Sequence, residues 1–147
     1  MRIKLNKEVE FFIKKFFFSE AYLLKKRLTR AYKKGYEEEL LILDKITPKN
    51  LDAIDVGVYR GVYTFVLAKI SKHVHAFEPN PLIHSFLRKN LTKIVENMTL
   101  YNIALSDKNG NANLRIPKRF DISNKENYEE LYKLGCATIH KKNIFKK

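Results

Sequence analysis

Between residues 47 and 105 the chain alternates short apolar runs with segments of helical spacing. Residues 51–56 form a short apolar run bounded by turn residues, as a buried parallel strand does, and 61–70 follow with apolar side chains at helical intervals. Residues 73–77 are the next predicted strand, and Pro81 stands where a second helix can begin. The pattern therefore predicts the strand, helix, strand, helix order of an α/β sheet.

The first part of the chain has a different pattern. Residues 6–44 carry apolar clusters at helical spacing, and Gly35 is predicted to separate two helices. A turn at 47–50 contains Pro48 and ends the second helix, because the residue before a proline is pushed out of helical geometry. We therefore expect a helical extension over 1–46 and a sheet domain over 47–147.

The first helix carries phenylalanines with lysines beside them. This pattern is compatible with an interfacial membrane helix or a helix that packs on a partner. The more ordinary interpretation is a cap packed on the sheet or a contact between copies of the chain.

The pattern also predicts strands beyond the second helix. Residues 98–105 read as a third strand, and 111–116 alternate apolar and polar side chains. Between them Asn109 and Gly110 tolerate the positive backbone angles of a tight hairpin. We therefore expect these two strands to pair antiparallel, with a short helix over 124–134 in the polar segment that follows.

Composition narrows the possible partners. The 147 residues carry a formal net charge of +13, a positive field that attracts anions. The basic residues are spread along the chain rather than gathered with aromatics into a recognisable module, so we expect no nucleic acid partner. A single cysteine fits the cytoplasm, the four histidines lack the spacing of metal ligands, and no stretch reaches the apolar length of a transmembrane segment.

A glycine turn separates the first predicted strand from its helix. Gly57 and Gly61 follow Asp55, and Glu78 ends the next strand, close to the roughly 20-residue offset expected of an acid that binds a ribose. Tyr59 stands where a dinucleotide-binding turn has its middle glycine, and its side chain would obstruct a pyrophosphate. S-adenosylmethionine has no phosphate, so the pattern favours this cofactor over NAD. A carboxylate at Asp55 would suit the cationic amino group of S-adenosylmethionine.

The order of the motifs resembles the FkbM family of S-adenosylmethionine-dependent methyltransferases, which use the class I Rossmann-like fold. The resemblance covers about 37–139 and includes DVG at 55–57, GVYT at 61–64, FEPNP at 77–81, ALSD at 104–107 and GCATI at 135–139. The family usually has alanine and asparagine where this chain has Val58 and Tyr59. It also continues with an acidic segment resembling KIDVEG, which this chain lacks.

The resemblance implies a cofactor held by the turn at 57–61, with Asp55 near the methionine moiety and Glu78 on the ribose. Pro79 and Asn80 would shape the adenine side, and residues near the end of the third strand would border the ring. The complete expected cofactor-binding set is Asp55, Gly57, Tyr59, Gly61, Thr64, Glu78, Pro79, Asn80, Ala104 and Ser106.

The resemblance also implies a function and an incomplete sheet. The expected activity is methyl transfer to a hydroxyl of a sugar or secondary metabolite, so the acceptor is a small molecule or glycan. Because the later strands are missing, we expect a truncated sheet whose open edge self-associates or is completed by a partner. The alternative is a non-catalytic cofactor-binding or interaction module. Glu78 could also merely cap the turn, and Asp55 could bond its own turn.

Overall fold

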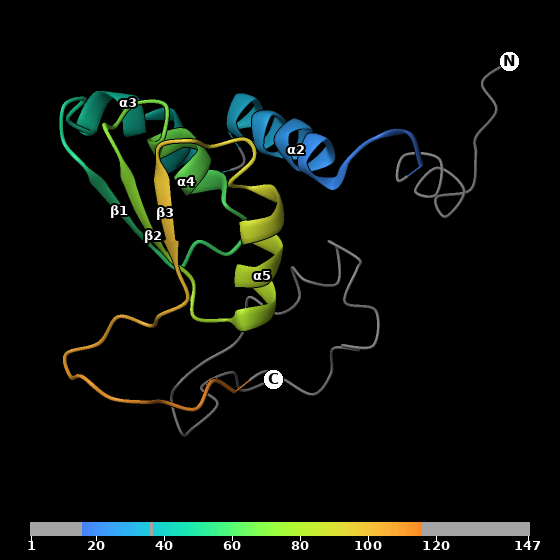
Figure 1. Ribbon diagram of the computed structural model, residues 1–147. Helices are drawn as coiled ribbons and strands as arrows, with labels where there is room; N and C mark the ends of the chain where they lie inside the picture. The colour runs from blue at the N-terminus through green and yellow to red at the C-terminus, as the bar shows by residue number, and fades with distance from the viewer. Residues whose placement is uncertain (1–15, 36, 116–147) are drawn as a thin grey trace, which may run out of the picture.

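The computed structural model describes residues 16–35 and 37–115 (Figure 1). Its elements follow in the order α2 (Glu20–Lys34), η1 (Glu38–Leu41), α3 (Leu43–Ile46), β1 (Ala53–Val56), α4 (Val62–Leu67), β2 (Val74–Phe77), α5 (Pro81–Asn90) and β3 (Met98–Tyr101). The strands form one parallel sheet in the order β1-β2-β3. The α/β class and the predicted strand, helix, strand, helix order are therefore confirmed.

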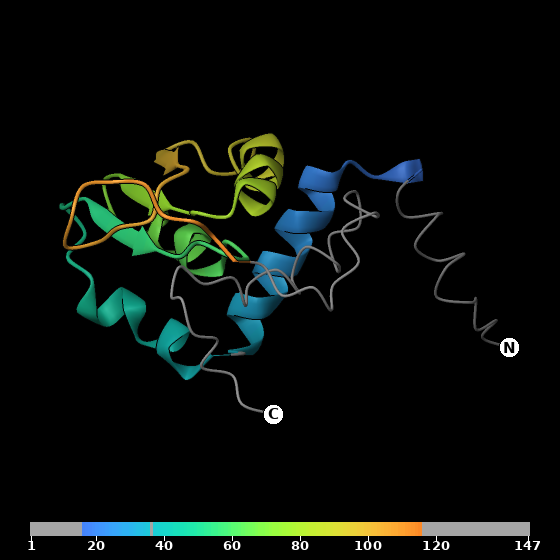
Figure 2. The ribbon, with the colours of Figure 1, turned by 90° about the horizontal axis from the view of Figure 1, so that it is seen from below.

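The helices α2, α4 and α5 lie on one face of the sheet (Figures 1 and 2). Val74 and Ala76 of β2 point to this face and are buried, because strand side chains alternate between faces. On the opposite face no described helix covers the sheet, and Ile54 and Val56 of β1 are 65% and 63% exposed. Among the described strands β1 pairs only with β2, so the expected association through its outer edge stays a prediction.

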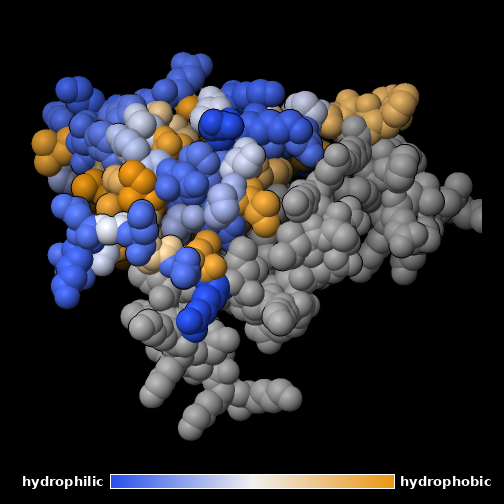
Figure 3. All heavy atoms as spheres, turned by 60° about the horizontal axis from the view of Figure 1, so that its bottom comes forward, coloured by the Kyte–Doolittle hydropathy of each residue, from blue (hydrophilic) through white to orange (hydrophobic). Residues whose placement is uncertain are grey.

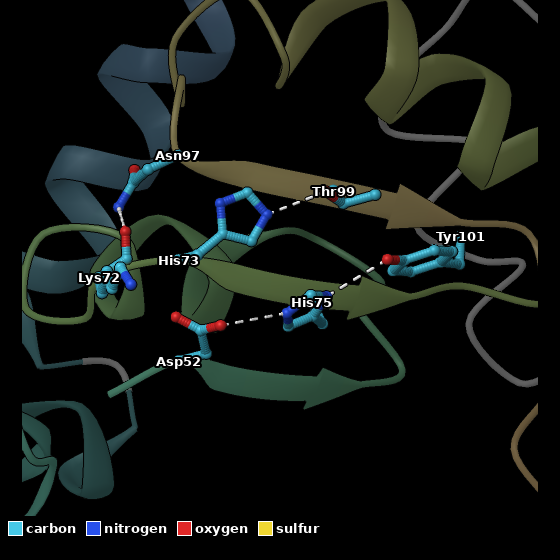
Figure 4. Close-up of polar contacts among 7 residues, drawn as sticks. All are labelled: Asp52, Lys72, His73, His75, Asn97, Thr99 and Tyr101. Carbon is cyan, nitrogen blue, oxygen red and sulfur yellow. Dashed lines mark hydrogen bonds and ion pairs between the residues drawn. The ribbon is translucent and has the colours of Figure 1, made fainter. Parts of the chain in front are cut away.

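Polar cross-strand pairs occupy the uncovered face (Figure 4). Nε2 of His73 lies 2.9 Å from Oγ1 of Thr99, and Nδ1 of His75 lies 3.3 Å from the Tyr101 hydroxyl. His75 Nε2 is also 3.5 Å from a carboxylate oxygen of Asp52. These side chains therefore satisfy one another's polar atoms across the strands. Within the described ranges, no group of three potential metal ligands is present.

Helix α2 belongs to the same hydrophobic core as the sheet. Its Leu24 and Leu28 are buried in one cluster with Val74 of β2 and with Leu87 of α5. The helix begins after Ser19, whose side chain accepts a hydrogen bond from the Tyr22 N–H, as N-cap residues do. It ends at Gly35, as predicted, because φ of 55° at this position favours glycine. Residues 1–15, which hold the first part of this predicted helix, lie outside the described part.

The third strand is shorter than predicted. It ends at Tyr101, and 102–114 contain no strand, so the predicted strand end at 105 and the antiparallel hairpin are wrong over the described residues. The side chain of Asn102 bonds the carbonyls that follow β2, and Ile103 and Leu105 are exposed. Because these two side chains are not buried, their alternation does not favour a strand here. The expectations for 116–147 lie outside the described residues.

Candidate functional site

The turn between β1 and α4 depends on three left-handed backbone positions. Gly57, Tyr59 and Gly61 have φ values of 86°, 48° and 77°. Two of them are glycines, which adopt this geometry without strain, whereas a tyrosine in it is uncommon. At Gly61 a Cβ would meet Leu91 Cδ2 at 3.0 Å, so α4 and the chain after α5 approach closely here. At Gly57 nothing lies within 4 Å of that position, which leaves open space at the end of β1.

Glu78 directly follows β2 and lies against this turn. Its Oε2 accepts a 2.8 Å hydrogen bond from the N–H of Tyr59, and its Oε1 accepts one of 2.8 Å from the N–H of Asn80. The side chain is only 4% exposed. The turn and the acid that the sequence paired are therefore adjacent. The hydrogen bonds of Glu78 are those of a carboxylate that caps and holds the turn, which is the simpler of the two interpretations offered by the sequence. The ribose-binding role stays a prediction.

Asp55 and Thr64 form a second pair in the turn. The Thr64 hydroxyl donates a 2.5 Å hydrogen bond to Asp55 Oδ2, and Thr64 is fully buried. Burial raises the pKa of the Asp55 carboxyl, and hydrogen bonds from the side chain and backbone of Thr64 oppose that rise. Asp55 thus fixes the first turn of α4, as acids near a helix start do. This is a structural role of the kind that the sequence left open for Asp55, but its partner lies in α4 rather than in the turn itself.

Two asparagine side chains hold the segment that follows β2, Asn80 from within it and Asn102 from the end of β3. The side chain of Asn80 caps α5 by accepting a hydrogen bond from the Leu82 N–H. Nδ2 of Asn102 donates to the carbonyls of Glu78 and Pro79 at 2.8 and 3.1 Å. Sequence reasoning missed Asn102, because the predicted third strand ran to residue 105 and placed Asn102 inside it rather than at its end. Together these amides fix the backbone from Glu78 to the start of α5.

Two members of the expected set lie elsewhere. Ala104 and Ser106 are exposed in the segment after β3, which leads away from the strand ends in Figure 1. The Ser106 hydroxyl bonds Asp107, and within the described residues no hydrogen bond joins these two positions to the turn. The structure thus gathers the other eight members at the carboxyl ends of β1 and β2. A border to an adenine ring from Ala104 and Ser106 stays a prediction.

A small pocket lies beside the turn, between α2, η1 and the start of α4. Its volume is about 160 Å³, and its polar lining comes from Arg27, Glu37 and Arg60. A hydrogen bond to Glu37 raises the pKa of the neighbouring Tyr63 to about 12, with burial and nearby carboxylates contributing less. The apolar part of the lining is formed by Leu28, Ala31, Leu40 and Val62. The pocket therefore places positively and negatively charged side chains next to an apolar surface.

Comparison with known proteins gives this chain no family. No family model matches it, and no curated protein or solved structure is similar enough to be counted as a relative. Across 16–35 and 37–115, no helix has the length and apolar character that crossing a bilayer requires. Any functional conclusion therefore has to rest on the site itself.

Proposed function

We propose that this chain binds S-adenosylmethionine at the turn between β1 and α4, as part of a class I Rossmann-like methyltransferase of the FkbM type. The observation that carries the proposal is the contact between Glu78 and the N–H of Tyr59 at the carboxyl ends of two parallel strands. In open α/β sheets ligands bind in the crevice outside these strand ends. An acid at the second strand end is the group that can hold a ribose there.

Space and hydrogen-bonding capacity support binding at this place. Gly57 is exposed and faces open space, so a ligand can approach its backbone. Each carboxylate oxygen of Glu78 accepts one backbone N–H, and a carboxylate oxygen can accept two hydrogen bonds. Two ribose hydroxyls would therefore use the remaining capacity. Because Glu78 is buried, the turn has to shift, and the strained backbone of Tyr59 is the natural place for that movement.

Asp55 would serve the amino end of the cofactor. Its carboxylate is partly buried and its pKa is raised, so an adjacent ammonium would stabilise its charged form. The bound cofactor supplies the electrophilic methyl group. The contribution of the chain is to hold the donor in line with an acceptor hydroxyl of a sugar or secondary metabolite, since alignment is what such a transfer requires.

A second candidate is a non-catalytic cofactor-binding or interaction module. The observation in its favour is that Glu78 and Asp55 already bond atoms of this chain, which a purely structural role would explain. In this alternative the turn only stabilises the fold, and the chain functions by binding another molecule through its surface.

Calorimetric titration with S-adenosylmethionine tests the proposal. We expect binding by the intact chain and a loss of about tenfold or more in Glu78→Gln, because hydrogen bonds to a charged group are strong. Glu96→Gln, at an exposed glutamate, is the matched control and should bind normally. Circular dichroism establishes that both variants fold. Absence of binding, or equal binding by all three proteins, would contradict the proposal.

A methyl-transfer assay separates the two candidates. Isotope-labelled S-adenosylmethionine and a panel of sugar and metabolite hydroxyls should give labelled product if the chain is an enzyme. Binding without any transfer would favour the module.

A further inference from the structure

Four aromatic residues protrude at the start of α2. Phe16 and Phe17 are 84% and 70% exposed, and Phe18 and Tyr22 are exposed beside them. The rings of Phe16 and Phe17 meet edge to face at 5.3 Å, and those of Phe18 and Tyr22 stack at 4.9 Å. We call these four residues the aromatic tip. Figure 3 shows hydrophobic side chains projecting at this end of the described chain. Contiguous exposed apolar side chains mark interaction surfaces.

A row of basic side chains continues from the tip along α2. Lys26, Arg30 and Lys33 follow Tyr22 at intervals of three or four residues, so all four lie on one face of the helix. All are exposed, whereas Ala21, Leu24, Leu28 and Ala31 face the core. We call the three cations the basic stripe. The acidic residue in the first turn, Glu20, already pairs with Lys89 at 3.3 Å.

The positive charge extends from α2 onto the neighbouring helix. Lys69, next to the end of α4, has its Nζ 4.0 Å from the centre of the Phe65 ring. Its pKa is lowered by burial first and then by the charges of Lys25 and Lys33. The positive charges of these lysines repel one another, and an anionic surface would relieve that repulsion.

We propose that the aromatic tip and the basic stripe form a docking surface for an anionic phospholipid membrane. Aromatic rings settle at the boundary between headgroups and acyl chains, and cationic side chains near the membrane are attracted to acidic lipids. Since the apolar face of α2 is buried in the core, the helix does not insert along its length. It lies over the headgroups with only its tip entering the interface. This inference is independent of the cofactor.

The position of the aromatic rings relative to the basic side chains favours a membrane over a nucleic acid as the partner. The aromatic rings gather at one end of the stripe and contact each other. Single-stranded nucleic acid is instead bound by aromatic rings placed along a basic groove, so that successive bases stack on them. A protruding aromatic end next to cations matches the two signals that stable membrane attachment requires.

Vesicle sedimentation with the full chain tests this inference. We expect binding to vesicles of phosphatidylcholine with phosphatidylserine, weak binding to phosphatidylcholine alone, and a decrease as salt is raised. Lys26→Glu combined with Lys33→Glu should lower binding about tenfold or more, since each cation near the surface contributes. Phe16→Ser combined with Phe17→Ser should lower it to a similar extent.

Matched controls carry the same changes elsewhere. Lys93→Glu with Lys108→Glu, at exposed lysines outside α2, should lower vesicle binding less than the stripe variant, and Leu105→Ser should bind like the unchanged chain. Thermal melts establish that all variants fold alike. The inference is overturned if vesicles containing phosphatidylserine do not bind, if the tip variant binds unchanged, or if uncharged vesicles bind equally well. Binding of a single-stranded oligonucleotide without vesicle binding would also overturn it.

Discussion

The carboxylate of Glu78 accepts a 2.8 Å hydrogen bond from the N–H of Tyr59, a residue whose φ is 48°. This bond offsets part of the strain of a tyrosine in the left-handed region, which is of order 1 kcal/mol or more. Asparagine tolerates this geometry more readily than tyrosine does, so the turn holds its backbone against the preference of the residue at this position.

Alanine substitutions should separate backbone strain from crowding in this turn. Gly57→Ala adds a Cβ in open space at φ of 86°, so we expect unfolding to become easier by about 1 kcal/mol. Gly61→Ala adds similar strain and also brings a Cβ to 3.0 Å from Leu91, so its loss should be about 1–3 kcal/mol larger. Urea denaturation measures both. Equal losses would show that Leu91 moves away without cost.

The elements that could be predicted are those with local signals. Gly35 ends α2 and Pro81 begins α5 because their backbone preferences act within one turn of helix. The extended third strand was wrong because alternation at Ile103 and Leu105 does not reveal whether a partner exists to cover them. Whether an alternating segment becomes a strand depends on tertiary contacts, which the sequence pattern does not contain.

The place of the turn next to Glu78 was predicted, but its contacts were not. The spacing of Gly57 and Glu78 placed both at the same sheet edge, where the structure has them, and their role toward a cofactor stays a prediction. The bond from the Tyr59 backbone to Glu78 was not predictable, because it joins residues 19 apart through a main-chain atom that carries no sequence signal. The same holds for Asn102, whose amide reaches carbonyls of the preceding strand end.

Removing the Leu24 side chain should destabilise the whole fold. Leu24 is buried in the same cluster as Val74, so Leu24→Ala should lower the free energy of unfolding by about 2–5 kcal/mol. Leu105→Ala, at an exposed leucine outside the core, should change it by no more than about 0.5 kcal/mol. Chemical denaturation followed by far-ultraviolet circular dichroism gives both values. Similar small effects would mean that α2 is a separate extension.

Asp55 should make stability fall as the pH rises. Its pKa is raised in the folded chain, so its contribution is fully present below pH 3.8 and is lost as the pH rises through the folded pKa. In Asp55→Asn this titration is absent while an oxygen remains to accept from Thr64. We therefore expect the variant to gain stability relative to the unchanged chain as the pH rises. Urea midpoints over a pH series test this, and a relative loss would refute it.

The Tyr63 hydroxyl should lose its proton at an unusually high pH. Its pKa is about 12, mainly because it donates a hydrogen bond to Glu37. The contribution to stability is fully present below pH 10 and is lost as the pH rises through about 12. In Glu37→Gln the pKa of Tyr63 should fall toward 10, and in Glu39→Gln, which removes only a distant charge, it should fall less. Carbon NMR of labelled tyrosine follows each phenol, and an unchanged pKa in Glu37→Gln would contradict the bond.

The central claim is that Glu78 holds the ribose of an adenosine cofactor, and a double-mutant cycle tests it most directly. The affinities of S-adenosylhomocysteine and its 2′-deoxy analogue are measured by calorimetry on the unchanged chain and on Glu78→Gln. The account predicts that loss of the hydroxyl weakens binding to the unchanged chain by about tenfold or more, and binding to the variant far less. The same loss in both proteins, or none in the unchanged chain, would contradict it.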